Sequence, residues 1–247
     1  MSNVLLRTKM DRGITFPIQS SCRHATGRTA SHQLMYCRSI LDEGQVPSSS
    51  SQDSVWGDLH AQASLPSGRL EIRPLQSNDL QAASVVLTRA FAGSDENITL
   101  SGASDYMKSM IGQGMKGLLL VAKLFPEDAS LLPPNQISRI IGLVALSFHP
   151  DTMQPSTTLP TPPDSAYLSN MAVDAKFRRQ GVASNLLRAA DIACARADRT
   201  TVHLHVNQVD EGTFNLYSSS GYKEIQRDGG FVKLRGLKPK ILMKKIL

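Results

Sequence analysis

The chain has 247 residues, a formal net charge of +6 and 41% hydrophobic residues. A chain of this size can bury a sizeable core, in one large domain or two small ones. No hydrophobic run reaches the roughly twenty residues that span a bilayer, so no membrane partner is expected. The excess of positive charge is too small to indicate nucleic-acid binding without a matching motif, and it suits an anionic coenzyme or acidic peptides.

Residues 1–60 differ in composition from the remainder of the chain. They lack hydrophobic periodicity, and the first forty residues carry six Lys or Arg against one acid, Asp11. This acid-poor, Ser-rich composition is typical of an organelle transit peptide, with a disordered tail as the alternative. We predict a transit peptide and linker over 1–60, with the boundary at about 60–68. Plastid import is favoured over mitochondrial import because Ser and Thr are frequent and no basic amphipathic helix is found.

Alternation and buried apolar runs predict a series of strands along the rest of the chain. The runs at 117–124 and 139–148 are expected to be antiparallel neighbours. In the strand 201–207, residues 202, 204 and 206 face one side and residues 203, 205 and 207 the other. The predicted strands are 70–73, 117–124, 139–148, 166–173, 201–207, 222–225 and 239–247.

Helical spacing of apolar residues predicts the helices. One begins at an N-cap formed by Asn78–Asp79 and reaches Phe91, and others cover 105–115, 181–197 and 211–219. The loop 149–164 contains five prolines and cannot lie inside a sheet, so it is either a solvated insertion or a wall of a binding site. These elements indicate one α/β domain over 61–247, with a mixed, mostly antiparallel sheet of about six to seven strands and about four helices.

The junction between strand 166–173 and the next helix carries the clearest chemistry. The first turn of a helix has unpaired N–H groups and partial positive charge, which together bind anions. Here Arg178 and Arg179 add charged donors, Gly181 lets a ligand approach the backbone, and small Ala183 leaves the helix start uncrowded. The turn is therefore suited to a diphosphate. An ordinary junction with solvated arginines is the alternative.

Arg178-x-x-Gly181-x-Ala183 resembles the Arg/Gln-x-x-Gly-x-Gly/Ala signature of the GCN5-related N-acetyltransferases, the GNAT superfamily. Asn215-Leu216-Tyr217 and the following Gly221-Tyr222 also fall where that family has its equivalents. The resemblance covers roughly 69–247 and implies the GNAT fold and acetyl-CoA as co-substrate, its pyrophosphate held at this turn. The coenzyme-binding residues that it implies are Met171, Ala172, Val173, Arg178, Arg179, Gln180, Gly181, Val182, Ala183, Ser184, Asn215 and Tyr217.

The resemblance also implies catalytic residues. It places Tyr217 beside the coenzyme sulfur as general acid, with aromatic packing as the alternative role. Tyr167 and His205 resemble the Tyr and His pair that orders a water in some protein N-terminal acetyltransferases, and such a base is needed because an amine is mostly protonated at neutral pH. His203 lies on the same face of its strand as His205 and is an alternative base.

Two further residues have narrower interpretations. Many relatives have Asn-x-x-Ala where this chain has Asp210 and Thr213, so Asp210 is expected to cap a helix or to bind the pantetheine amides. Cys194 lies among alanines without a neighbouring His, which indicates a packed thiol and not a nucleophile. No metal-ligand spacing is found, and no metal site is predicted.

These features together predict a plastid N-acetyltransferase that uses acetyl-CoA and transfers directly to the acceptor. Protein N-terminal α-amines are the favoured acceptors and lysine ε-amines a second class, because Tyr167 and His205 resemble the protein enzymes. A small-molecule amine acetyltransferase and a non-catalytic acetyl-CoA-binding protein are the alternatives. The sequence leaves the oligomeric state open.

Overall fold

The computed structural model describes residues 55–94, 96–153, 156 and 158–247. The predicted transit peptide therefore lies almost wholly outside the described residues. The described part folds around one eight-stranded sheet with the order β1-β2-β3-β4-β5-β6-β8-β7. The strands are β1 (Ala61–Leu65), β2 (Gly68–Pro74), β3 (Gly117–Pro126), β4 (Arg139–Ser147), β5 (Ala166–Val173), β6 (Thr201–Asn207), β7 (Lys223–Arg227) and β8 (Lys240–Ile246).

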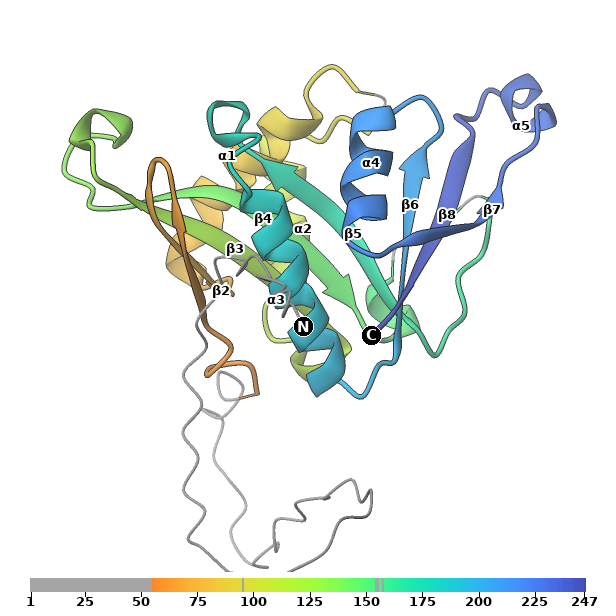
Figure 1. Ribbon diagram of the computed structural model, residues 1–247, viewed down its shortest axis with the longest axis horizontal. Helices are drawn as coiled ribbons and strands as arrows, with labels where there is room; N and C mark the ends of the chain where they lie inside the picture. The colour runs from red at the N-terminus through yellow and green to blue at the C-terminus, as the bar shows by residue number, and fades with distance from the viewer. Residues whose placement is uncertain (1–54, 95, 154–155, 157) are drawn as a thin grey trace, which may run out of the picture.

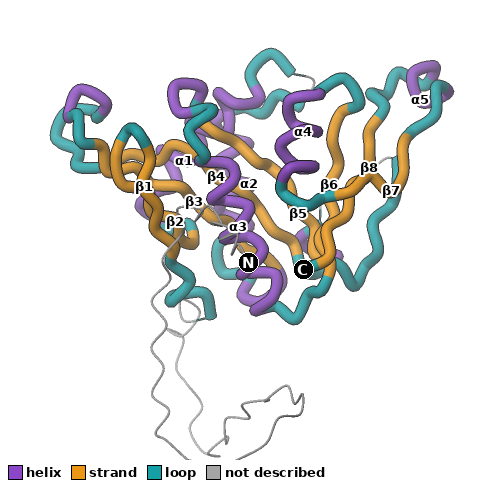
Figure 2. Tube along the Cα trace, viewed as in Figure 1, coloured by secondary structure: helices purple, strands orange, loops and turns teal. Residues whose placement is uncertain are grey.

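The sheet is mostly antiparallel, as predicted, and Figure 2 shows the strands side by side across the molecule. The expected pairing of β3 with β4 is confirmed, and only β5 and β6 run parallel among the described strands. The strand β3 is apolar along nearly its whole length because helices cover both faces of the sheet at this point. The sheet has one strand more than the upper end of the predicted range.

Helices lie on both faces of the sheet (Figure 1). On one face, α1 (Leu80–Phe91) and α2 (Leu100–Met110) pack on alternate residues of β3 and β4 such as Leu119 and Leu143. On the other face, α3 (Val182–Arg196) packs on the intervening residues, and α4 (Glu211–Ser219) joins the same core through Tyr217. A short fifth helix, α5 (Phe231–Leu234), lies between β7 and β8. None of the helices in the described part of the chain is both long enough and apolar enough to cross a bilayer.

The helix α2 begins and ends earlier than the predicted 105–115. Thr99 is its N-cap, and the Thr99 side chain accepts a hydrogen bond of 3.1 Å from the Gly102 N–H. The chain leaves the helix after Met110 because Gly112 and Gly114 follow with φ of 82° and 56°. The spacing of the methionines correctly predicted that a helix exists here, but the N-cap Thr99 sets where the helix begins.

The first strand, β1, was not predicted. It forms a hairpin with β2, in which Ala61 pairs with Ile72 and Leu65 with Gly68. Its apolar residues alternate with Gln62 and Ser64, but two of the three are alanines and only Ala61 is fully buried, so the hydrophobic signal is weak. Just before it, the Trp56 ring stacks on Phe148 with 5.7 Å between centroids, and its Nε1 donates to the Gly114 carbonyl at 2.9 Å. The core therefore includes residues that precede the predicted domain boundary at about 60–68.

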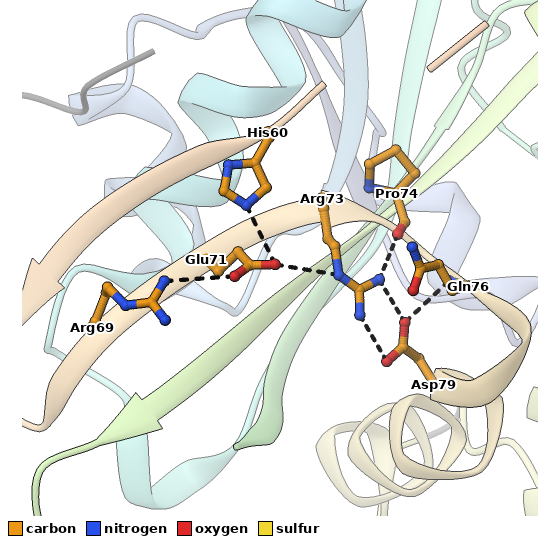
Figure 3. Close-up of polar contacts among 7 residues, drawn as sticks. All are labelled: His60, Arg69, Glu71, Arg73, Pro74, Gln76 and Asp79. Carbon is orange, nitrogen blue, oxygen red and sulfur yellow. Dashed lines mark hydrogen bonds and ion pairs between the residues drawn. The ribbon is translucent and has the colours of Figure 1, made fainter. Parts of the chain in front are cut away.

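A charged network fixes the corner between β2 and α1 (Figure 3). Asp79 occupies the N-cap position of α1 as predicted, but its carboxylate accepts no hydrogen bond from that helix. It instead receives two hydrogen bonds from the Arg73 guanidinium, at 2.7 and 3.1 Å. Glu71 extends the network, with its carboxylate 3.4 Å from Arg73 Nε and 3.3 Å from His60. The pairing holds the start of α1 against the sheet.

Candidate active site

The strands β5 and β6 separate shortly after they begin. They pair only at Ala166 with Val202 and at Tyr167 with His203, and they then diverge toward the top of Figure 1. From Leu168 to Val173, the β6-facing edge of β5 has no strand partner among the described residues. Backbone N–H and C=O groups on such an edge can hydrogen-bond an extended amide-bearing ligand in place of a strand.

A β-bulge lies in β5 beside this opening. Leu143 of β4 pairs with Ala172 and Ala145 pairs with Ser169, so that Asn170 and Met171 stand opposite a single residue. Asn170 has a φ of 51°, which asparagine tolerates better than most residues. A bulge bends its strand and changes the direction in which the following groups face. Here the following groups belong to Ala172 and Val173, which the sequence predicts to bind the coenzyme together with Met171.

An ion pair holds the turn that follows β5. The Asp174 carboxylate accepts a hydrogen bond of 2.8 Å from Arg139 Nη2 and one of 3.0 Å from the Lys176 N–H. The same guanidinium lies 5.1 Å from the ring centroid of buried Phe177. Sequence reasoning missed Arg139 and Asp174. The signal for them was weak, because an Arg at a strand start and an Asp after a strand are common on any surface.

The turn presents its donors at the start of α3. Arg179 and Gly181 have φ of 62° and 90°, and no side chain caps the helix. The Asn185 N–H is the first to bond backward, to the Gly181 carbonyl at 3.0 Å. The preceding N–H groups of residues 182–184 have no backbone acceptor among the described residues. The turn thus offers the anion-binding groups that the sequence predicts.

The arginine side chains of the turn are open to solvent, and two side chains of the turn hydrogen-bond to backbone carbonyls. Arg178 and Arg179 are exposed, and Arg178 Nε donates to the Val173 carbonyl at 3.2 Å. Gln180 is half-buried and its Nε2 donates to the Lys176 carbonyl at 3.4 Å. The predicted residues 178–184 therefore lie together, in one turn at the end of β5.

Tyr167 and His205 form a hydrogen-bonded pair. The Tyr167 hydroxyl lies 2.9 Å from His205 Nδ1, and His205 Nε2 lies 2.8 Å from the Leu159 carbonyl. A carbonyl only accepts, so Nε2 carries the proton and Nδ1 accepts from the tyrosine hydroxyl. Burial lowers the pKa of His205, which keeps its imidazole neutral near pH 7. The pair therefore consists of a neutral imidazole, which can accept a proton, and a tyrosine hydroxyl that donates a hydrogen bond to this imidazole.

The environment of Tyr167 keeps its phenol protonated. Burial, and to a lesser extent the negative charge of Glu96, raise its pKa to about 12. Leu159, which holds the other side of His205, belongs to the proline-rich loop 149–164 and is itself buried. The Thr158 hydroxyl of the same loop donates to Asp228 at 2.9 Å. This part of the loop therefore packs against His205 and Asp228 and is not a solvated insertion.

Tyr217 lies near this pair, on α4. It is only 5% exposed, and its ring meets that of Tyr222 edge-on at 5.6 Å. Burial is the main cause of its raised pKa, and the nearby Tyr167 and Asp210 raise the pKa further. The structure thus brings together the three predicted catalytic residues from β5, β6 and α4. Asp210 caps α4 by accepting from the Thr213 N–H at 2.9 Å, as one of its two interpretations predicts.

Three other candidates take no part in the Tyr167–His205 hydrogen bond. His203 is 2% exposed and its Nδ1 has no partner among the described residues, while His205 makes the contact with Tyr167. Cys194 is buried, and burial raises the pKa of its thiol to about 12. Asn215 lies two residues from Tyr217 and so faces another side of α4. It lines a cavity of about 330 Å³ together with Gln208, Glu211, Phe214, Arg227 and Ile241.

Comparison with known proteins agrees with this geometry. Residues 135–224 match the family model described as "Acetyltransferase (GNAT) domain". The chain is 34% identical over 197 residues to GCN5-related N-acetyltransferase 5, chloroplastic, of Arabidopsis thaliana, covering 74% of this chain and 60% of that protein. It is 28% identical over 125 residues to GCN5-related N-acetyltransferase 10, chloroplastic, of the same plant, covering 50% and 48%. The chain spans about half to three-fifths of the length of these relatives.

Solved structures share the fold. The GNAT domain of S. lividans PAT superposes with a TM-score of 0.54 at 14% identity, covering 76% of this chain and 97% of that chain. The NatC complex bound to Gag peptide and CoA superposes with a TM-score of 0.50 at 17% identity, covering 72% and 98%. At these identities the likeness concerns the fold alone. With a matching family model and a relative at 34% identity, the chain carries a GNAT acetyltransferase domain.

Proposed function

We propose that this protein is an acetyl-CoA-dependent N-acetyltransferase that modifies protein N-terminal α-amines, with lysine ε-amines as a second class of acceptor. The observation that carries the proposal is the Tyr167–His205 hydrogen bond of 2.9 Å, with Tyr217 close by, at the opening between β5 and β6. A base, an acid and an anion-binding turn then border one opening. The base and the acid serve proton transfer in the reaction of a thioester with an amine, and the turn suits the diphosphate of the coenzyme.

The turn and the bulge fit the coenzyme in different ways. The N–H groups of residues 182–184 and the two arginines suit the diphosphate, and the free edge of β5 suits the amides of pantetheine. Ala172 and Val173 follow the bulge, where a backbone N–H can bind the carbonyl oxygen as negative charge develops on it. Acetyl-CoA supplies the activated acetyl group, and the turn and the bulge hold this group in position.

The proton of the acceptor amine has a defined route. The protonated amine first releases one proton to the Tyr167 oxygen, directly or through water, and its nitrogen lone pair then attacks the acetyl carbon. The Tyr167 hydroxyl proton passes to His205 Nδ1 along the 2.9 Å hydrogen bond. The resulting imidazolium keeps its Nε2–H bond to the Leu159 carbonyl, which favours the charged form. A protonated amine can therefore be used at neutral pH.

The leaving group needs a partner as the carbon–sulfur bond breaks. Tyr217 stays protonated across the working pH range because burial raises its pKa. Its hydroxyl can hydrogen-bond the departing thiolate and give a proton to the sulfur, and the second proton released by the acylated nitrogen restores the hydroxyl. Cys194 takes no part, because it is buried on α3 with its pKa raised to about 12. Transfer is therefore direct, without an acyl-enzyme.

Plastid location belongs to the same proposal. Both curated relatives are named as chloroplastic, and residues 1–60 have the composition of a transit peptide. A fusion of the full chain to a fluorescent protein tests this in plant cells. Fluorescence within chloroplasts is expected, and fluorescence confined to the cytosol would contradict the location without affecting the chemistry.

The acceptor class is tested with the full chain, acetyl-CoA and a library of peptides that have free N-termini and internal lysines. Mass spectrometry then reports which nitrogen gains the acetyl group. We expect acetylated N-termini, and loss of the products in Tyr217→Phe. A library with blocked N-termini isolates transfer to lysine. If peptides stay unmodified while small amines are acetylated, the protein-acceptor proposal is wrong. If no amine is modified although acetyl-CoA binds, the chain is a binding protein.

A further inference from the structure

An ion pair joins two distant segments beside the Tyr167–His205 pair. Lys240 Nζ, at the start of β8, lies 3.0 Å from the Glu96 carboxylate in the loop between α1 and α2. That loop lies at the top of Figure 1, at the end of the molecule where β5 and β6 diverge. The two side chains keep 32% and 48% of their surface exposed, so the contact can be reached from solvent.

Both charges act on the catalytic pair. Glu96 is close enough to Tyr167 to contribute to the raised pKa of its phenol, and Lys240 is close enough to His205 to contribute to its lowered pKa. The Lys240 backbone is fixed, because its N–H donates to the Asp228 carboxylate at 2.8 Å and that carboxylate also accepts from Thr158. The aminoalkyl side chain of Lys240 therefore extends from an anchored position to a carboxylate beside the proposed base.

We propose that Glu96 binds the ammonium group of the incoming acceptor, and that Lys240 occupies this position in the free protein. The inference rests on the proposed function, because it concerns an acceptor that arrives as a protonated amine. Lys240 presents to Glu96 the same chemical group that a lysine ε-amine or an N-terminal α-amine would present. An acceptor that replaces Lys240 holds its nitrogen near Tyr167, where the proton can be removed.

The alternative is that the ion pair only fastens the α1–α2 loop to β8. The two roles predict opposite results for Lys240. If the pair is a fastener, Glu96→Gln and Lys240→Met both break it and change acceptor binding in the same direction. If Glu96 is the binding group, Glu96→Gln weakens acceptor binding, whereas Lys240→Met removes a competitor and strengthens it. The effect expected in each direction is about three- to five-fold, the upper end for a partly exposed ion pair.

Equilibrium binding to the full chain in the presence of CoA is the test, at about pH 7.5, where a peptide amine is largely protonated. The probes are a short peptide beginning Ala-Ser and the same peptide with its α-amine acetylated. The parent is expected to prefer the free amine, Glu96→Gln to lose this preference, and Lys240→Met to increase it. Equal affinity of the parent for both peptides, or the same direction of change in both variants, would overturn the proposal.

Two controls complete the design. The charge swap that combines Glu96→Lys with Lys240→Glu restores an ion pair without the original carboxylate, so binding is expected to stay weak. Asp105→Asn removes the same charge from an exposed pair with Lys108 on α2, and no change is expected. Turnover is measured in parallel with acetyl-CoA. Peptide binding that depends on Glu96 without peptide acetylation would refute the proposed function alone, and acetylation that does not depend on Glu96 would refute this inference alone.

Discussion

At the scale of single residues, the buried phenols Tyr217 and Tyr222 differ in their surroundings. Their rings meet edge-on at 5.6 Å, but Tyr222 is packed with its hydroxyl buried and without a hydrogen-bond partner in the described structure. Tyr217 lies near Tyr167 and therefore near the opening between β5 and β6. Substitution by phenylalanine removes the hydroxyl and keeps the ring at either position. Tyr222→Phe is therefore a matched control for Tyr217→Phe.

We expect Tyr217→Phe to lower kcat by about 100-fold or more, the usual contribution of a positioned acid. The KM for acetyl-CoA should change little, since the ring is kept. Tyr222→Phe removes an unsatisfied buried hydroxyl and should leave the rate unchanged and the stability unchanged or slightly raised. Steady-state kinetics with detection of the released thiol measures both variants. A parental rate in Tyr217→Phe would show that the leaving group needs no acid here.

Tyr167 and His205 are expected to act as one unit. Tyr167→Phe and His205→Gln should each lower kcat by about 100-fold, and the double variant should be little worse than either single variant. The parent kcat should stay level as the pH falls to about 6.5 and drop only below it, because burial lowers the pKa of His205 below this ordinary value. This acid limb should be absent in His205→Gln. Additive losses in the double variant would separate the two roles.

At the scale of elements, the strand–turn–helix unit from β5 to α3 is the proposed coenzyme-binding unit. Its geometry depends on Gly181, whose φ is 90° and around which a Cβ would meet only the Asn185 side chain, at 3.8 Å. Space is therefore not the constraint at this position. A side chain would strain the backbone by about 1–2 kcal/mol in this left-handed conformation. The ion pair between Arg139 and Asp174 holds the other end of the turn.

The turn can be tested with two ligands. Combined Arg178→Ala and Arg179→Ala should weaken acetyl-CoA binding by about 10-fold, and Gly181→Ala should weaken it as well. Acetyl-pantetheine lacks the diphosphate, so its affinity should be the same in the arginine variant and the parent. Calorimetric titration measures both ligands. Equal weakening for the two ligands would mean that the arginines act through the structure of the turn and not on the diphosphate.

At the scale of the whole molecule, the three loops around the Tyr167–His205 pair come from distant parts of the chain. The α1–α2 loop, the loop before β5 and the segment between β7 and β8 meet through Glu96 with Lys240 and through Thr158 with Asp228. Accurate placement of the site therefore depends on the complete core, including its N-terminal edge.

That edge gives a prediction about the domain boundary. Trp56 is 8% exposed, stacks on Phe148 and donates a hydrogen bond to Gly114, and Leu59 is 2% exposed. A chain that starts at residue 55 should match the stability of the full chain, whereas one that starts at residue 61 should lose about 3–5 kcal/mol, as does Trp56→Ala. Urea denaturation followed by circular dichroism measures this. Equal stability of the two truncated chains would support the boundary at 60–68.

The sequence by itself determined the elements whose patterns are local. The turn Arg178–Gly181 and the alternation of β6 can be recognised without knowledge of their neighbours, because a helix start and a two-residue period are properties of a few consecutive residues. Tyr217 and the Tyr167–His205 pair were identified by resemblance to the family. Spacing alone gives no means of knowing that residues 38 positions apart would lie 2.9 Å from each other.

The tertiary structure decided what depends on contacts between distant residues. β1 carries too little hydrophobicity to be recognised alone, and it forms because β2 offers an edge to pair with. The Leu159 carbonyl fixes the tautomer of His205 across 46 positions, and Glu96 meets Lys240 across 144. Such contacts depend on how the sheet opens between β5 and β6 and on where the loops return. A local pattern specifies a strand, whereas the assembled sheet specifies which side chains share a site.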